Sequence, residues 1–169
     1  MTLDELNQAS AGQRADFFHN QCAASRWIER MVASAPFASK EAVLIAARQH
    51  WGSMNETDWR EAFDGHPMIG NIDSLRAKYQ SSRGHSSKEQ SGVEAASDAT
   101  LQALADENQA YLDRHGFIFI VFASGKSAGQ MLDQLRARIH NSTGQELKLA
   151  AAQQLKITLL RLDTQITCN

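Results

Sequence analysis

The sequence is poor in proline and cysteine and has no long apolar run. Among its 169 residues only Pro36 and Pro67 are prolines, and this scarcity is typical of a helical protein with few rigid turns. Cys22 and Cys168 form no CxxC pattern, so we expect two reduced thiols rather than a metal centre or a disulfide framework. The longest apolar run, residues 117–123, is too short to cross a bilayer, so no membrane span is expected.

An excess of charge of one sign is also missing. The net charge is −2 and no block of Lys or Arg occurs, so the chain lacks the basic surface on which nucleic-acid binding depends. Its first residues are acidic and mixed rather than apolar with a basic flank, and we therefore expect a cytoplasmic protein without a secretory leader. The length, with 43% hydrophobic and 21% charged residues, predicts one globular domain over residues 1–169.

Helix-start signals recur along the chain. In a capping box, a Ser or Thr and a Glu or Gln three residues later satisfy each other's backbone amides. Four pairs have this spacing: Thr2 with Glu5, Ser10 with Gln13, Ser127 with Gln130, and Thr143 with Glu146. Further helices are expected to start at Ser39 and at Asn55 or Thr57, and one is expected to end at Gly65. Apolar residues at helical spacing follow these starts, so the sequence predicts helices over most of its length.

One segment departs from this pattern. Residues 117–122 read Phe-Ile-Phe-Ile-Val-Phe, and their aromatic and β-branched side chains favour a strand. No second strand pattern exists to pair with it, so we expect an extended buried segment near 117–123 lying among helices. The predicted fold is therefore an all-α, single-domain bundle of about eight or nine helices with this one extended segment.

His66 is the first candidate for chemistry. It lies between a predicted helix end and Pro67, which restricts the backbone around it, and constrained loops often carry functional residues. An imidazole also has the ordinary pKa nearest neutrality, which suits proton transfer. The alternative is a surface or satisfied core histidine. The other five histidines lie near predicted helix ends or in a Ser-rich loop and are weaker candidates: His19, His50, His85, His115 and His140.

Glu89 is the second candidate. It follows Ser86 and Ser87 in the predicted first turn of a helix and shares a face with Val93, which would direct it inward. The neighbouring Gln90 offers both a donor and an acceptor at the same helix end. The alternative is that Glu89 is only a first-turn capping acid.

Arg161 is the third candidate. It stands among apolar residues, three positions after Thr158 on the predicted inner face of the last helix, residues 145–165. An inward guanidinium needs an anion or a carbonyl, which a substrate carboxylate or ureido group would supply. The alternative is a solvated arginine.

Other chemistries find little support. There is no HExxH motif, no paired cysteine and no His pair at i,i+4 with a carboxylate, so no metal site is expected. Phosphate-binding loops and dinucleotide fingerprints are absent. Ser86 or Ser87 beside His66 leaves a Ser–His nucleophilic pair open, although no GxSxG context accompanies it.

Taken in order, the motifs resemble the OHCU decarboxylases, whose substrate is 2-oxo-4-hydroxy-4-carboxy-5-ureidoimidazoline, formed from urate by way of 5-hydroxyisourate. The resemblance rests on Trp59 and Phe63 with residues 66–70 (HPMIG), on residues 86–90 (SSKEQ), on Tyr111 with residues 116–121, on residues 138–141 with Glu146, and on Lys156, Ile157, Arg161 and Leu162. HPxIG alone is weak, but its combination with SxxEQ and the aromatic segment is specific. Ile118 stands where family members commonly have proline.

The resemblance implies an all-helical, often dimeric enzyme without a cofactor that releases CO2 to give (S)-allantoin. By resemblance His66 is the catalytic imidazole and Glu89 its acidic partner. The substrate-binding residues implied are Pro67, Ser86, Gln90, the main chain of Phe119, Ile120 and Val121, and Arg161. The expected partners are the small-molecule substrate and a second copy of the chain, with no nucleic acid and no membrane.

Two other functions stay open at this point. A non-catalytic helical module could bind a purine-derived ureide in the same pocket, although the intact His66, Glu89 and Gln90 argue against it. A metal-assisted hydrolase of a related ureide would be inhibited by a chelator, whereas the decarboxylase would not be.

Overall fold

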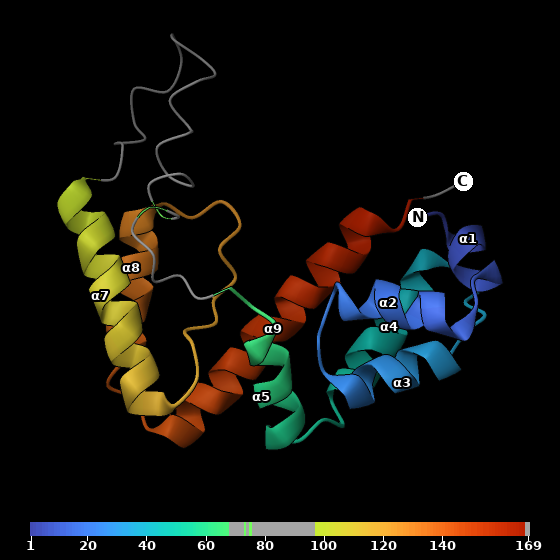
Figure 1. The fold of residues 1–169 in the computed structure, drawn as a ribbon, viewed down its shortest axis with the longest axis horizontal. Helices are drawn as coiled ribbons and strands as arrows, with labels where there is room; N and C mark the ends of the chain where they lie inside the picture. The colour runs from blue at the N-terminus through green and yellow to red at the C-terminus, as the bar shows by residue number, and fades with distance from the viewer. Residues whose placement is uncertain (68–72, 74, 76–96, 168–169) are drawn as a thin grey trace, which may run out of the picture. The chain divides into compact units, whose positions relative to one another are not determined.

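The fold is helical (Figure 1). The computed structural model describes residues 1–67, 73, 75 and 97–167. Within these residues lie eight α-helices and no β-strand: α1 (Leu3–Gln8), α2 (Ala11–His19), α3 (Ser25–Ala33), α4 (Lys40–Trp51), α5 (Glu56–Asp64), α7 (Asp98–His115), α8 (Ala128–Arg138) and α9 (Thr143–Gln165). The predicted all-α class is thereby confirmed. None of the helices in this described part is both long and apolar enough to span a membrane.

The chain forms two compact units. The first comprises Met1–His66 and Leu147–Asn169, and the second comprises Pro67–Glu146. The expectation of one domain over residues 1–169 stays a prediction.

The core of the first unit is built around aromatic side chains. Phe18 of α2 meets Trp27 of α3 edge to face, with 5.9 Å between ring centroids, and both side chains are fully buried. A buried indole N–H needs a partner. Trp51 of α4 donates its Nε1–H to the carbonyl of Ala151 at 3.0 Å, so that α4 packs on α9 within this unit. These contacts hold the helices that carry the candidate site.

Local capping signals set five of the eight described helix starts as predicted. The capping boxes at Thr2, Ser10 and Ser127 are all present, with both reciprocal hydrogen bonds formed. Ser39 and Asn55 cap α4 and α5, and Gly65 ends α5. These starts are confirmed because each depends only on residues two or three positions apart.

The predicted capping box of Thr143 with Glu146 is wrong by one residue. Ser142 caps α9 instead, since its hydroxyl accepts from the Gln145 amide at 3.3 Å while the Gln145 side chain accepts from the Ser142 amide at 3.0 Å. The sequence contains two overlapping pairs with the capping-box spacing, Ser142 with Gln145 and Thr143 with Glu146. Because Gln145 makes the capping contact, Glu146 is not needed at the helix start, and its side chain is fully buried in the interior.

Glu146 is the centre of a buried polar cluster in the second unit. Its carboxylate accepts hydrogen bonds from Tyr111 Oη at 2.5 Å, from Arg138 Nη2 at 2.7 Å and from Asn141 Nδ2 at 2.8 Å. We call these four residues the Glu146 cluster. Burial raises the pKa of Glu146, but the hydrogen bonds from Arg138, Tyr111 and Asn141 outweigh it and place this pKa below its ordinary value.

The segment near 117–123 lies outside any helix, as predicted. It follows Gly116, which ends α7 with a φ of 75° that favours glycine. Phe117, Phe119, Ile120 and Val121 are buried. Arg138 donates from Nη1 to the Ile120 carbonyl at 2.9 Å and its guanidinium stacks 4.6 Å from the Phe119 ring centroid. The Glu146 cluster therefore anchors this segment.

Candidate functional site

His66 is placed by the end of α5. The helix stops at Gly65, and the His66 amide donates to the Phe63 carbonyl at 3.0 Å, which closes a turn. Pro67 follows directly and is exposed. The His66 side chain is half-buried, and its Nε2 lies 2.6 Å from Oε1 of Gln154 on α9. The backbone of His66 is thus constrained on both sides, by the end of α5 and by Pro67.

The close approach of two backbones beside His66 requires Gly65. A Cβ built on Gly65 would lie 2.6 Å from the Cβ of Ala23, in the turn between α2 and α3. Real Cβ atoms do not come this close, so only glycine allows α5 to end against that turn. Both residues line the pocket described next.

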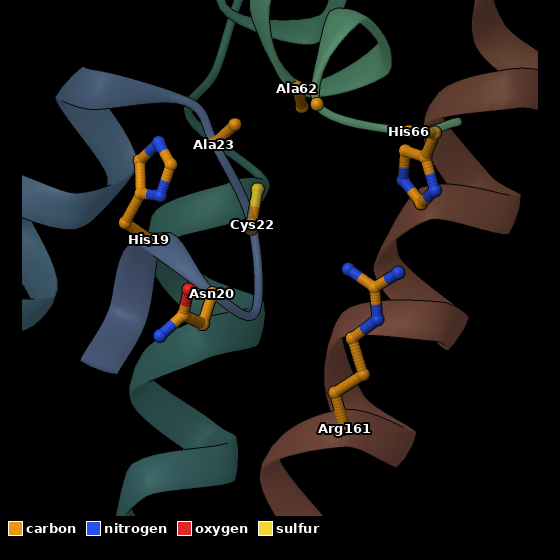
Figure 2. A pocket seen from close by; sticks show the side chains of 8 residues that line it. His19, Asn20, Cys22, Ala23, Ala62, His66 and Arg161 are labelled. Carbon is orange, nitrogen blue, oxygen red and sulfur yellow. The ribbon is translucent and has the colours of Figure 1, made fainter. Parts of the chain in front are cut away.

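A pocket of about 220 Å³ lies beside the His66 ring (Figure 2). It is lined by His19, Asn20, Cys22, Ala23, Ala62, Gly65, His66 and Arg161, all in the first unit. Figure 2 shows His66 and Arg161 on one side of the pocket and His19 on the other. The structure therefore brings two predicted site residues, His66 and Arg161, to one cavity.

Arg161 reaches the pocket from α9. Its Nη1 donates to the Gln21 carbonyl at 3.1 Å, which anchors one arm of the guanidinium. A guanidinium has five N–H donors, so a group held in this way can still present donors to an anion or a carbonyl. Arg161 is therefore not a freely solvated arginine, and the arrangement suits a ligand with a carboxylate or ureido group.

The environment of His66 favours the neutral imidazole. Burial lowers its pKa below the ordinary value of 6.5, the hydrogen bond with Gln154 raises it, and the positive charge of Arg161 lowers it further, with a net lowering. A neutral imidazole at physiological pH keeps one nitrogen lone pair and so can accept a proton.

Several pocket residues were missed by sequence reasoning. His19 was set aside as a helix-end histidine, and the pocket-lining Cys22 was considered only as a reduced thiol. Gln154 was not singled out. A signal was available: Gln154, Thr158 and Arg161 are spaced i, i+4, i+7 and so share one helix face.

The remaining predicted site residues are not tested by the structure. Ser86, Glu89 and Gln90 lie outside the described residues. Phe119, Ile120 and Val121 belong to the second unit, and their assignment to the substrate site stays a prediction. The Ile120 carbonyl, which sequence reasoning left for the substrate, already accepts a hydrogen bond from Arg138.

No cluster of three or more potential metal ligands (His, Cys, Asp or Glu) occurs in the part of the chain that the structure describes. The pocket offers two imidazoles, a thiol and a guanidinium. Burial raises the pKa of Cys22 to about 11, so this sulfur is a thiol at neutral pH. These groups suit hydrogen bonding and proton transfer to an organic ligand.

Comparison with known proteins places the chain in a family. The sequence model described as OHCU decarboxylase matches residues 7–163. The chain belongs to the OHCU decarboxylase family. The resemblance seen in the sequence motifs is thus confirmed over nearly the whole chain, and with it membership of a family of carboxy-lyases.

Individual relatives agree with this family. The chain is 38% identical over 141 residues to the "Uric acid degradation bifunctional protein TTL" of Arabidopsis thaliana, covering 83% of this chain but only 44% of that protein. It is 23% identical to the "2-oxo-4-hydroxy-4-carboxy-5-ureidoimidazoline decarboxylase" of Halalkalicoccus jeotgali, covering 96% of this chain and 90% of the relative. A crystal structure of an OHCU decarboxylase in the presence of (S)-allantoin matches with a TM-score of 0.71 and 34% identity, over 89% of this chain and 96% of that one.

Gly65→Ala should disturb the pocket wall of this OHCU decarboxylase family member. Because the added methyl would collide with Ala23, we expect a loss of about 1–3 kcal/mol in the free energy of unfolding, measured by urea denaturation. Gly12→Ala is the matched control in the same unit, since a Cβ there meets nothing within 4 Å. Equal stabilities of the two variants would show that the contact at Ala23 relaxes without cost.

Proposed function

We propose that the chain decarboxylates 2-oxo-4-hydroxy-4-carboxy-5-ureidoimidazoline to (S)-allantoin without a cofactor, as the last step from urate to allantoin. The observation that carries the proposal is the half-buried His66 imidazole facing a small pocket that Arg161 also lines. Family membership over residues 7–163 supports it, and so do the relatives, one named as a uric acid degradation protein and one as a decarboxylase of this substrate. We also propose that the protein is a cytoplasmic homodimer.

In the proposed reaction, His66 acts on the hydroxyl group of the carbon that bears the carboxylate. A neutral imidazole accepts the hydroxyl proton or a hydrogen bond from it. The bond between this carbon and the carboxylate then breaks, CO2 leaves, and the electron pair enters the adjacent C=N unit of the ring. A proton delivered to one face of the ring sets the S configuration. We assign Glu89 as the acidic partner of His66 in this reaction.

The remaining proposed residues orient the substrate. Arg161 would hold a polar edge of the ring or the ureido group, together with Gln90. Contact between a guanidinium and the departing carboxylate would oppose its loss, so orientation is the better role for Arg161. Pro67, Ser86 and the main chain of residues 119–121 complete the proposed substrate site.

The decisive experiment supplies freshly generated substrate and follows the product by circular dichroism. Spontaneous decay gives racemic allantoin with no net signal, whereas the enzyme should give the signal of the S enantiomer at a rate proportional to protein concentration. Binding of an allantoin-like ureide without any enantiomeric excess would favour the binding module and contradict the decarboxylase. Inhibition by a chelator would point to the metal-assisted hydrolase.

The pH dependence of kcat/KM should have an acidic limb. A base must be neutral to act, and burial keeps the pKa of His66 below 6.5, so activity should be level near neutral pH and fall tenfold per unit below that pKa. Arg161, His19 and Cys22 are the other titratable or charged groups described in the pocket. A pH–rate profile from pH 4.5 to 8.5 checks this, and a rate that rises on acidification would contradict a basic role for His66.

A further inference from the structure

A buried amide on α9 contacts the His66 ring. Gln154 has a relative exposure of 0%, and its Oε1 lies 2.6 Å from His66 Nε2. A side-chain amide oxygen carries no hydrogen and can only accept. At this distance the hydrogen must therefore be on His66 Nε2, because two lone pairs facing each other would repel.

The amide of Gln154 is itself held in this orientation. Its Nε2 donates to Oγ1 of Thr158, one turn further along α9, at 3.2 Å. Thr158 is only 1% exposed, so water is not available to replace this partner. His66, Gln154 and Thr158 form a continuous chain of hydrogen bonds from the pocket into the core.

We infer that Gln154 is a positioning residue that holds neutral His66 as the Nε2–H tautomer and leaves the Nδ1 lone pair for the substrate. In a neutral imidazole only one nitrogen carries hydrogen, and the hydrogen bond at one nitrogen decides the state of the other. This inference rests on the proposed function for its catalytic meaning. It assigns the Nδ1 atom of His66 as the base or hydrogen-bond acceptor for the substrate hydroxyl.

The tautomer can be measured without any substrate. In protein labelled with 15N-histidine, two-bond correlations between ring nitrogens and carbon-bound protons distinguish a protonated nitrogen from one with a lone pair. The His66→Ala variant assigns the His66 signals among the six histidines. At pH 7.5 we expect the Nε2–H form of His66. A predominant Nδ1–H form would overturn the inference, whatever the enzymatic activity.

Two substitutions of matched size separate positioning from packing. Gln154→Met fills the space but removes the acceptor, so His66 should become a mixture of tautomers. Gln154→Glu keeps an acceptor oxygen and should keep a hydrogen on Nε2, while its carboxylate raises the pKa of His66 and moves the acidic limb to higher pH. A purely structural role predicts instead that a buried carboxylate is the more harmful change. His115, which hydrogen-bonds to Thr143 and to the Ile139 carbonyl, provides signals that should not move in either variant.

Kinetics complete the test. For Gln154→Met we expect kcat to fall about 10- to 100-fold with KM little changed, part of the ~10²–10⁴-fold that a positioned base contributes. Gln154→Glu should retain most of kcat at pH values above the raised pKa of His66. Wild-type kcat in Gln154→Met, with His66 still Nε2–H, would overturn the inference while leaving the decarboxylase assignment intact. If Gln154→Met does not fold, Thr158→Val tests the same chain of hydrogen bonds and should shift the His66 tautomer toward a mixture.

Discussion

Substitution of His66 by alanine is expected to lower kcat for decarboxylation by roughly 10²–10⁴-fold, the range that a positioned general base contributes. The imidazole faces the pocket from the end of α5. The measurement is the rate of (S)-allantoin formation followed by circular dichroism, with the spontaneous rate subtracted. The far-ultraviolet spectrum should keep its helical signal, since a half-buried ring at a helix end contributes little to the core.

His50→Ala is the matched control for this result. His50 lies in the same unit on α4, does not line the pocket, and has one ring nitrogen 2.8 Å from the Ser34 hydroxyl. Loss of a partly buried side-chain hydrogen bond should leave kcat near the wild-type value. Turnover of folded His66→Ala at the rate of His50→Ala would remove His66 from the mechanism.

Substitution of Glu146 by alanine should have the largest effect on stability, a loss of about 3–5 kcal/mol in the free energy of unfolding. The change leaves the guanidinium of Arg138, which is only 14% exposed, without its carboxylate. It also removes the acceptor for the Tyr111 hydroxyl and the Asn141 amide. Because the Arg138 side chain anchors the Ile120 carbonyl, we expect the change to disturb the segment near 117–123 as well.

Urea denaturation monitored by circular dichroism measures this loss, and Glu107→Ala is its control. Glu107 also pairs with an arginine in the second unit, but Arg136 is exposed and its charge stays solvated when the partner is removed. The contribution of Glu146 depends on its ionised carboxylate. Since its pKa lies below the ordinary 4.5, this stabilisation is present above pH 4.5 and is lost as the pH falls through the folded-state pKa. Equal effects of the two substitutions at pH 7 would contradict a structural role for the Glu146 cluster.

Sequence reasoning predicted helices well wherever the signal was local. The caps at Thr2, Ser10, Ser39 and Ser127 each rest on one side chain and an amide three residues away, so a short window contains the whole interaction. The start of α9 could not be chosen in this way, because Ser142 and Thr143 both have a suitable partner three residues on. The choice depends on the burial of Glu146 against α7 and α8 residues, which no local window contains.

The candidate site likewise combines features that local sequence predicts with contacts between distant residues that it does not predict. His66 could be selected from its own neighbourhood, since Gly65 and Pro67 limit the backbone on either side. Its contact with Gln154 joins residues 88 positions apart and could not be predicted from either neighbourhood alone. Apolar spacing along α9 carries no information about a buried amide with two hydrogen-bond partners.

By itself the sequence determined the helical class, most helix starts, the family motifs and the identity of His66 and Arg161 as candidates. Each of these depends on short-range capping, on periodicity or on a run of residue types. Only the tertiary structure decided that both side chains line one pocket, that Gln154 faces the His66 ring, and that Glu146 is a core anion rather than a cap. The physical reason is that buried hydrogen bonds form between side chains from distant parts of the chain, and their partners are settled when the helices pack.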